Sequence, residues 1–179
     1  VDNYEVGIKG VLADNTIRYS AAAFFIEWQY PQARITGYNS GIDGVGNSTS
    51  DAESKGLELE ISGLIGEGLA YTFGYAYTDA EFVEDGGLYT DSIVGGAKLP
   101  GHSKNMLAAS LVYSMQIDGN PLDIGTDVFY RSDYDNALPG NFNEYDIDSI
   151  TIWNVNASYQ VGSWRVGLFA KNLADENSV

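Results

Sequence analysis

Two stretches of alternating apolar and polar residues, joined by a short glycine-containing turn at 66–68, occupy the middle of the sequence between Ser54 and Phe82. In the first stretch, leucine and isoleucine at 57, 59 and 61 alternate with Glu58, Glu60 and a serine. In the second, aromatic residues at 71, 73, 75 and 77 alternate with small or hydroxyl-bearing residues. This period of two predicts a β-hairpin with one apolar face. The other face carries carboxylates, so it cannot lie in a dry core, where each unpaired charge costs several kcal/mol.

The same alternation recurs along most of the chain. It predicts further strands at 4–12, 16–30, 106–115, 122–130, 150–161 and 164–172. Short turns near 14–15, 66–68, 119–120 and 162–163 alternate with three long polar connections, at 31–51, 83–104 and 132–148. The run at 16–30 is long for a soluble strand, whose usual length is about 5–6 residues. The pattern indicates an up-and-down meander of about eight strands with all its long loops at one end, as in outer-membrane barrels.

Composition excludes several classes of protein. The formal net charge of -16 argues against nucleic acid as a partner, because that interaction needs a basic surface. The absence of cysteine excludes disulfides and thiolate metal sites. There is no apolar run of about 18 residues, so no transmembrane helix is expected, but a spanning β-strand needs only about 9–11 alternating residues. The sequence opens at Val1 directly before a strand, as expected for a fragment or a mature segment.

One continuous sheet would place the charged and amide residues of these strands on a single side. They are Glu5, Lys9, Arg18, Glu58, Glu60, Asp123, Asp127, Asn154, Asn156, Arg165 and Lys171. The outer face of a soluble β-sandwich shows the same alternation, so this pattern leaves both architectures open. Strand length favours a transmembrane barrel. So do aromatic residues at the ends of the runs (Trp28, Tyr30, Trp153 and Trp164), which suit belts at a lipid interface.

Other candidate sites have simpler interpretations. His102 is the only histidine and has no histidine or cysteine cluster around it, which favours a structural place in a loop. Two acidic groups, Glu81 with Glu84 and Asp85, and Asp133 with Asp135, Asp146 and Asp148, offer oxygen ligands for Ca²⁺. They lack the spacing of an EF-hand loop, so solvated acidic loops are the favoured interpretation. Glu58 and Glu60 lie roughly 6.5–7 Å apart on one strand face, a separation compatible with glycoside hydrolysis, but such an enzyme also needs a converging pocket.

Six segments carry a family resemblance. They are NYEVGIKG at 3–10, AAAFFIEW at 21–28, ESKGLELE at 53–60, GYAYTDAEF at 74–82, KLPGHSKN at 98–105 and FAKNLADE at 169–176. In this order and spacing the sequence resembles the C-terminal part of the β-barrel of TonB-dependent outer-membrane receptors. The resemblance implies an all-β, antiparallel, up-and-down transmembrane β-barrel, of which residues 1–179 supply about eight of roughly 22 strands. It also implies that the plug domain, the TonB-contacting segment and the final strand lie outside this sequence.

The function implied by the resemblance is active transport across the bacterial outer membrane. The expected ligand is a ferric siderophore, or else cobalamin or a carbohydrate, with energy passed by TonB to the plug; the expected partners are outer-membrane lipid, TonB and the ligand. No enzymatic activity, cofactor or metal site is expected, and Glu58 and Glu60 would face the plug. The loops at 38–51, 83–104 and 132–148 would form part of the extracellular vestibule, with Tyr89, Tyr134 and Tyr145 as candidate ligand contacts, because amphipathic aromatic residues suit binding surfaces.

Two alternatives remain from the sequence. One is a secreted, soluble, acidic β-sandwich that acts as a carbohydrate-binding or adhesion module, with or without Ca²⁺. It predicts short strands and a dry core between two sheets. The other is a glycosidase that uses Glu58 and Glu60.

Overall fold

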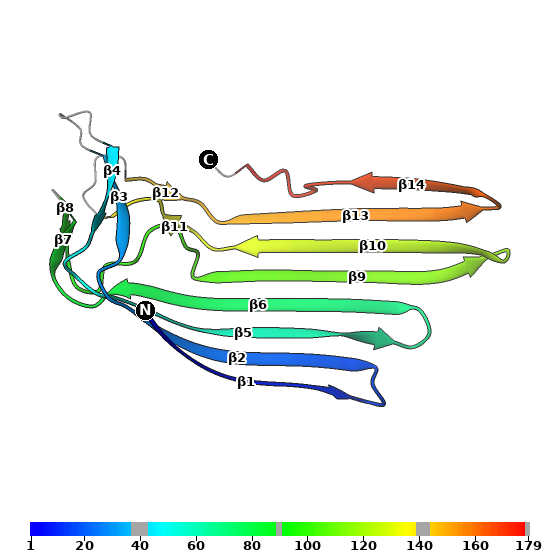
Figure 1. The fold of residues 1–179 in the computed structure, drawn as a ribbon. Helices are drawn as coiled ribbons and strands as arrows, with labels where there is room; N and C mark the ends of the chain where they lie inside the picture. Colours follow the sequence, from blue (N-terminus) through cyan, green and yellow to red (C-terminus); the bar gives the residue numbers. More distant parts are fainter. Residues whose placement is uncertain (37–42, 89–90, 139–143, 178–179) are drawn as a thin grey trace.

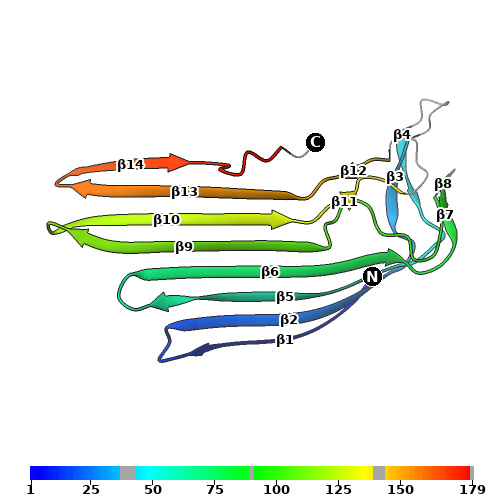
Figure 2. The ribbon, with the colours of Figure 1, turned by 180° about the vertical axis from the view of Figure 1, so that it is seen from behind.

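A single antiparallel sheet forms the body of the molecule in the computed structural model, which describes residues 1–36, 43–88, 91–138 and 144–177. Its strands are β1 (Asp2–Leu12), β2 (Ile17–Trp28), β5 (Ala52–Ile65), β6 (Leu69–Phe82), β9 (Asn105–Ile117), β10 (Asn120–Arg131), β13 (Ile150–Val161) and β14 (Trp164–Ala170). They pair in the order β1-β2-β5-β6-β9-β10-β13-β14, so each strand neighbours the next long strand in the chain (Figure 1, Figure 2). The predicted up-and-down meander is therefore confirmed. Within the described ranges no helix is long and apolar enough to cross a membrane.

The two ends of the sheet differ, as the lengths of the connections predicted. Short turns join the strands at one end, called the turn end here, and the three long connections gather at the other, the loop end (Figure 1). Each long connection contains a small hairpin of its own: β3 (Gln32–Thr36) with β4 (Asp43–Asn47), β7 (Gly86–Leu88) with β8 (Asp91–Ile93), and β11 (Tyr134–Asp135) with β12 (Asp146–Ile147). The sequence predicted only polar loops there. In β7, β8, β11 and β12 the strands have only two or three residues, too few alternating positions to be recognised.

Backbone geometry explains where two strands differ from their predicted bounds. β2 stops before Tyr30, whose φ of 50° is incompatible with an extended strand. The turn between β9 and β10 is tighter than predicted, because Asp118 and Gly119 both have positive φ, 50° and 77°, as two-residue hairpin turns require. Pro121 consequently lies inside β10, opposite Gln116.

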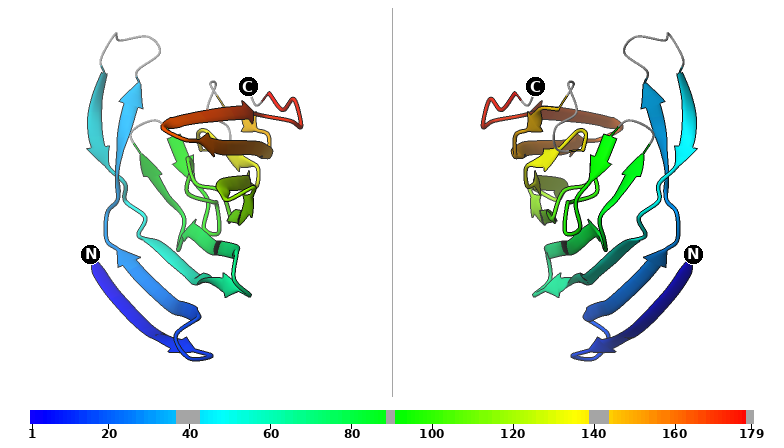
Figure 3. Two further views of the ribbon diagram at one scale, coloured as in Figure 1. Left: turned by 90° about the vertical axis from the view of Figure 1, so that its right-hand side faces the viewer. Right: turned by 90° about the vertical axis from the view of Figure 1, so that its left-hand side faces the viewer.

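The pairing register sorts the side chains into two faces. The charged and amide residues predicted to share a side do so in the ladders, apart from Lys171, which follows the end of β14. This side is called the polar face, and the opposite side, which carries Leu57, Leu59 and their cross-strand neighbours, is called the apolar face. Figure 3 shows that the sheet they cover is curved into an arc. A curved sheet with two chemically distinct faces has the form of a barrel wall.

One aromatic residue lies on the face opposite to the one predicted. Trp153 and Trp164 belong to the apolar face, where an interfacial belt requires them. Trp28 instead pairs with Ala52, which places it on the polar face at the loop end. Its position next to a rim of folded loops, rather than next to lipid, explains an aromatic residue there.

Among the described residues, buried apolar side chains occur only at the loop end. Among the described residues the buried apolar side chains are Ala52, Ala80, Phe82, Ile93 and Leu138. Four of these form one cluster, called the rim core here: Ala52, Phe82, Ile93 and Leu138, with Ala97 and Leu99 packed against it. The apolar face of the sheet remains open, with Leu59 43% and Leu168 76% exposed. A soluble β-sandwich would bury that face against a second sheet, so this structure does not match the sandwich alternative.

A pair of glycines on the polar face provides a test of the packing between strands. A Cβ added at Gly56 would collide with the carbonyl oxygen of Tyr77 and with the ring of Phe24, whereas a Cβ at Gly74 would approach only Ala108 O, at 3.9 Å. We expect Gly56→Ala to lower the free energy of unfolding by about 1–3 kcal/mol, because strand backbone must shift. Gly74→Ala should leave it unchanged within about 0.5 kcal/mol. Urea unfolding of the intact protein in lipid vesicles measures both, and equal losses would contradict the close contact at Gly56.

Candidate functional site: the polar face and the loop end

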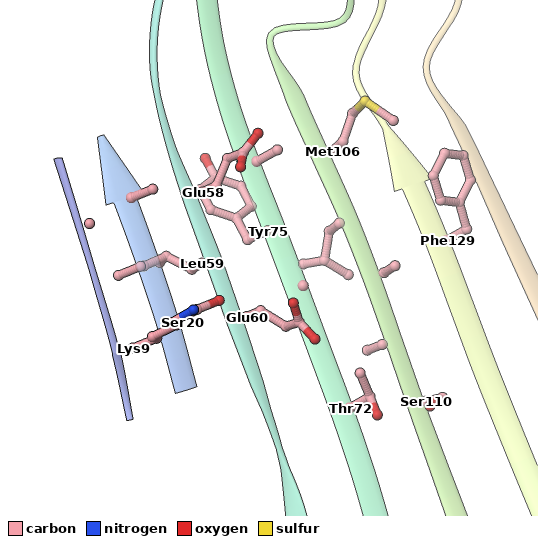
Figure 4. A pocket seen from close by; sticks show the side chains of 18 of the residues that line it. Lys9, Ser20, Glu58, Leu59, Glu60, Thr72, Tyr75, Met106, Ser110 and Phe129 are labelled. Carbon is pink, nitrogen blue, oxygen red and sulfur yellow. The ribbon is translucent and has the colours of Figure 1, made fainter. Parts of the chain in front are cut away.

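The polar face contains a broad groove across β1, β2, β5, β6, β9 and β10, with a volume of about 910 Å³ (Figure 4). Small residues from neighbouring strands form its floor: Gly7, Ala22, Gly74, Ala76 and Ala108. Polar side chains of the same face, including Lys9, Ser20, Glu60 and Thr72, line it toward the turn end. A hollow with this lining suits water or a polar protein surface rather than lipid.

Acidic residues of the polar face toward β13 are hydrogen-bonded within the sheet. Asp127 accepts a hydrogen bond from the Asn154 side chain at 2.7 Å, and Asp123 accepts one from the Ser114 hydroxyl at 2.7 Å. Such charge-assisted bonds across neighbouring strands stabilise the ladder and satisfy carboxylates that face away from lipid. The carboxylates of Asp123 and Asp127 in this part of the polar face therefore have hydrogen-bond partners in the sheet.

At the loop end the polar face changes character and becomes apolar. We call the residues there the loop-end patch: Met106, Phe129, Ile150 and Ile152. In the register, Met106 and Ile150 flank Arg131, while Ala108 and Ile152 flank Phe129. Figure 4 shows Met106 and Phe129 projecting from neighbouring strands. Arg131, the last residue of β10, lies at the loop edge of this patch.

Arg131 is the last residue of β10, and its neighbours Ser132 and Tyr134 fix its position. Its guanidinium carbon lies 4.7 Å from the centre of the Tyr134 ring, a cation-π contact. The next residue, Ser132, is buried, and its backbone N–H donates to Asn105 O at 2.8 Å. The Ser132 hydroxyl in turn accepts from the Asn105 N–H at 3.1 Å. Asn105 also accepts a hydrogen bond from the Tyr75 hydroxyl at 2.7 Å, so the base of the arginine is anchored to β9 and β6.

The structure brings two of the three predicted tyrosines together. Tyr134 lies in β11, half-buried, opposite Ile147 of β12. Tyr145 is 56% exposed and lies just before the same hairpin's second strand, where its N–H donates to the Asn136 side chain at 2.8 Å. Tyr89 lies outside the described residues. Ligand binding by the three tyrosines stays a prediction.

The sequence analysis did not single out Arg131 or the loop-end patch. The sequence contains a signal of apolar residues on the polar face. Alternation is interrupted in Phe24-Phe25-Ile26 and in Val128-Phe129-Tyr130, where consecutive apolar or aromatic residues occupy both faces of the strand. Both breaks in the alternation occur near the loop ends of their strands.

The remaining candidates take structural positions. Glu81 forms an ion pair with Lys55 at 3.4 Å, and Asp85 accepts a hydrogen bond from the Gly95 N–H at 2.9 Å. In the part of the chain that the structure describes, no group of three or more histidine, cysteine or acidic residues could hold a metal ion. His102 contacts the carbonyl oxygen of Leu99 within its loop.

A charged row marks the loop-end boundary of the apolar face. Lys104 forms an ion pair with Asp79 at 2.9 Å and lies 5.5 Å from the centre of the Tyr77 ring. The hydrogen bonds to Asp79 and to Tyr77 raise the pKa of Lys104 above its usual value. Below this row the apolar face of β5 runs from Leu57 to Ile65, about 27 Å of strand at 3.4 Å per residue. At the strand tilt of about 35–45° usual in outer-membrane barrels, this length rises about 20 Å along the barrel axis, close to the height of about 25 Å of their apolar band.

These features together define the wall of an outer-membrane β-barrel, with lipid on the apolar face and a lumen on the polar face. A family model described as "TonB dependent receptor-like, beta-barrel" matches residues 1–173, so the chain belongs to the TonB-dependent receptor family. Members of this family are outer-membrane receptors and transporters of Gram-negative bacteria that bind siderophores and interact with TonB. The predicted family, fold and location are confirmed.

Individual relatives agree with this assignment. The chain is 26% identical to the ferric-pyoverdine M114 receptor PbuA of Pseudomonas sp. (strain M114), over 97% of this chain and 21% of that protein. It is also 26% identical to the metal-pseudopaline receptor CntO of Pseudomonas aeruginosa, over 96% of this chain and 23% of that protein. Its fold matches crystal structures of the siderophore receptor PiuA from Acinetobacter baumannii and the ferric yersiniabactin uptake receptor FyuA from Yersinia pestis. PiuA has a TM-score of 0.74 at 22% identity, over 98% of this chain and 24% of that one. FyuA has a TM-score of 0.75 at 17% identity, over 98% of this chain and 25% of the FyuA chain. The chain thus spans about a fifth to a quarter of the length of these relatives.

Proposed function

We propose that residues 1–179 are the C-terminal part of the barrel of a longer receptor that transports a metal chelate, a ferric siderophore first of all, into the periplasm. The observation that carries this proposal is the division of one sheet into a lipid-facing apolar side and a grooved polar side, topped at one end by three folded loops. The relatives named above are receptors for ferric pyoverdine and metal-pseudopaline, which supports a metal chelate over cobalamin or a carbohydrate.

The edges of the sheet support the proposal that more strands complete the wall. β1 and β14 each pair with one neighbour only among the described strands. An open edge exposes unpaired N–H and C=O groups, which lipid does not tolerate. Strands supplied by the rest of the receptor would close the barrel, and a plug domain would fill the groove of the polar face, where Glu58 and Glu60 would face it.

The mechanism that follows requires no covalent step. The folded loops capture the chelate at the cell surface, the barrel wall holds the plug below it, and energy passed through TonB displaces the plug so that the chelate enters. The residues of this chain would bind the chelate and position the plug. Because the family consists of receptors and transporters, we assign this chain no chemical reaction on the ligand.

Uptake of radioactive iron tests this function in the native strain grown under iron limitation. We expect deletion of the receptor gene to abolish uptake of at least one ferric chelate from a set that includes ferric pyoverdine, and deletion of TonB to abolish the same uptake. Re-expression of the full reading frame should restore it. Unchanged uptake of every chelate in the set in the receptor deletion would reject the function proposed here.

A further inference from the structure

Two of the loop hairpins, β3 with β4 and β7 with β8, are joined by a short segment of the chain, residues 48–51, called the strap here. We propose that the strap holds these two hairpins together as one body, so that they move as a unit, and not as two independent loops, when the vestibule takes up a ligand. The inference rests on the proposed function, because it concerns loops that would capture the chelate.

The strap lies between the two hairpins. It follows β4 directly and leads into β5, while the segment that faces it, residues 83–87, leads from β6 into β7. Figure 1 shows both hairpins at the loop end of the sheet, in which β5 and β6 are neighbours. A movement of one hairpin relative to the other therefore has to separate the strap from residues 83–87.

Backbone hydrogen bonds continue the pairing of β5 and β6 through the strap. The Val83 N–H donates to Asp51 O at 2.9 Å, and the Thr49 N–H donates to Gly87 O at 3.0 Å. The Gly87 N–H in turn donates to the Thr49 hydroxyl at 2.9 Å. Such a ladder resists separation of its two segments, because each backbone group that leaves it loses a partner.

Ser50, in the strap, is fully buried, with 0% of its surface exposed. Its hydroxyl donates to Glu84 O at 2.7 Å, and its N–H donates to the Ser48 hydroxyl at 3.0 Å. A Cβ added at Gly86 would lie 2.8 Å from both Ser50 Cβ and Ser50 N, so glycine at this position allows the two segments to approach closely. A partial separation would leave a buried hydroxyl unpaired, which makes intermediate positions of the hairpins unfavourable.

The strap is also anchored to the strands beside it. The Asp51 side chain accepts a hydrogen bond from the Tyr30 N–H at 3.1 Å, which ties the strap to the chain just after β2. Ala52, the first residue after the strap, and Ile93, the last residue of β8, both belong to the rim core. Independent movement of either hairpin would therefore disturb contacts on both sides of the strap.

Distances between two nitroxide labels, measured by pulsed electron paramagnetic resonance, test the proposal in the purified, ligand-free, full-length receptor in detergent. One label replaces Asn47, the last residue of β4, and the other replaces Val94, which follows β8; both side chains are exposed. We expect a single narrow distribution of distances. Ser50→Ala should broaden it, because the Glu84 carbonyl loses its partner.

Ser54→Ala is the matched control, because Ser54 is a half-buried serine inside β5, outside the strap, so the distribution should stay narrow. Either of two outcomes would overturn the proposal: a broad distribution before any change at Ser50, or a narrow one that Ser50→Ala leaves as it was.

A reversible cross-link tests the same proposal during transport. The Thr49 hydroxyl oxygen lies 2.9 Å from Gly87 N, which brings cysteines at these two positions within reach of a disulfide, and residues 1–179 contain no other cysteine. If the hairpins move as one body, the Thr49→Cys, Gly87→Cys double variant should take up the ferric chelates at the same rate when oxidised as when reduced. A slower uptake on oxidation that a reductant reverses would show that the hairpins have to separate, and would reject the proposal.

Failure of the proposed function is distinguishable from failure of this inference. It appears in cells as iron uptake that survives deletion of the receptor gene, whereas the distances between the labels are measured without any ligand.

Discussion

Replacement of Leu59 by lysine is expected to destabilise the membrane-inserted receptor by about 2–4 kcal/mol, the cost of a cation near the middle of the lipid-facing band of a β-barrel. Leu59 lies between Leu57 and Ile61 on the apolar face of β5, and it is flanked across the ladder by Ala21 and Tyr75. None of these neighbours offers a carboxylate, so the lysine ammonium would have to reach an interface or draw water into the bilayer. Urea unfolding of the intact receptor in lipid vesicles, followed by tryptophan fluorescence, measures the change.

Leu64→Lys is the matched control for this experiment. Leu64 lies in the same strand but in the opposite face, pairs with Ala70 and is 58% exposed. The lumen side and the turn end both give a lysine access to water, so we expect a loss of no more than about 1 kcal/mol. Equal losses for Leu59→Lys and Leu64→Lys would show that the two faces do not meet different solvents, and the division of the wall into lipid and lumen sides would be wrong.

The fold was predictable because its main signal is local. Each long strand carries its own alternation, and a meander pairs each long strand with the next one, so the sequence order and the turn lengths were enough to place the polar residues on one face. Glu58 in β5 and Asp127 in β10 illustrate this, although two strands, β6 and β9, lie between β5 and β10 in the sheet. They share a face because residues alternate between the two faces within each strand and the short turns keep neighbouring strands in register. Trp28 shows the limit of residue type as a signal: its aromatic character suggested the lipid side, whereas counting by twos from Arg18 places it on the polar face, as the register does.

The loop end was less predictable because its contacts are not local. Ile93 and Leu138 are isolated apolar residues in polar segments, and nothing in either segment shows that they meet Phe82 in one cluster. Tyr134 was chosen as an aromatic residue in a loop, whereas the arginine beneath it was seen only as the end of a strand. Their contact depends on the turn at Ser132 and on its hydrogen bonds to Asn105, which are formed by residues that are distant in the sequence.

Replacement of Phe82 by alanine is the second change with a large expected effect, a loss of about 3–5 kcal/mol in the stability of the loop rim. Phe82 is 6% exposed and packs with Ala52, Ile93 and Leu138, each from a different segment of the loop end. The structure offers no other buried apolar cluster among its described residues to hold these segments together. Removal of the ring would leave a cavity among three segments: the start of β5, the connection between β6 and β9, and the connection that follows β10.

Hydrogen exchange of the intact receptor, read by mass spectrometry, measures this loss locally. The Gly96 N–H donates to Phe82 O at 2.8 Å, and the Phe82 N–H donates to Ala97 O at 2.9 Å, so exchange of peptides that contain these amides reports opening of the rim core. We expect their protection to fall in Phe82→Ala, while amides in the middle of β5 keep theirs, because local opening does not require the wall to unfold.

Val83→Ala is the comparison that separates packing from a general effect of mutation at this site. Val83 follows Phe82 directly but is 50% exposed, so its truncation should change protection by no more than about 0.5 kcal/mol. Equal losses of protection in Phe82→Ala and Val83→Ala would show that the rim core does not depend on the buried ring.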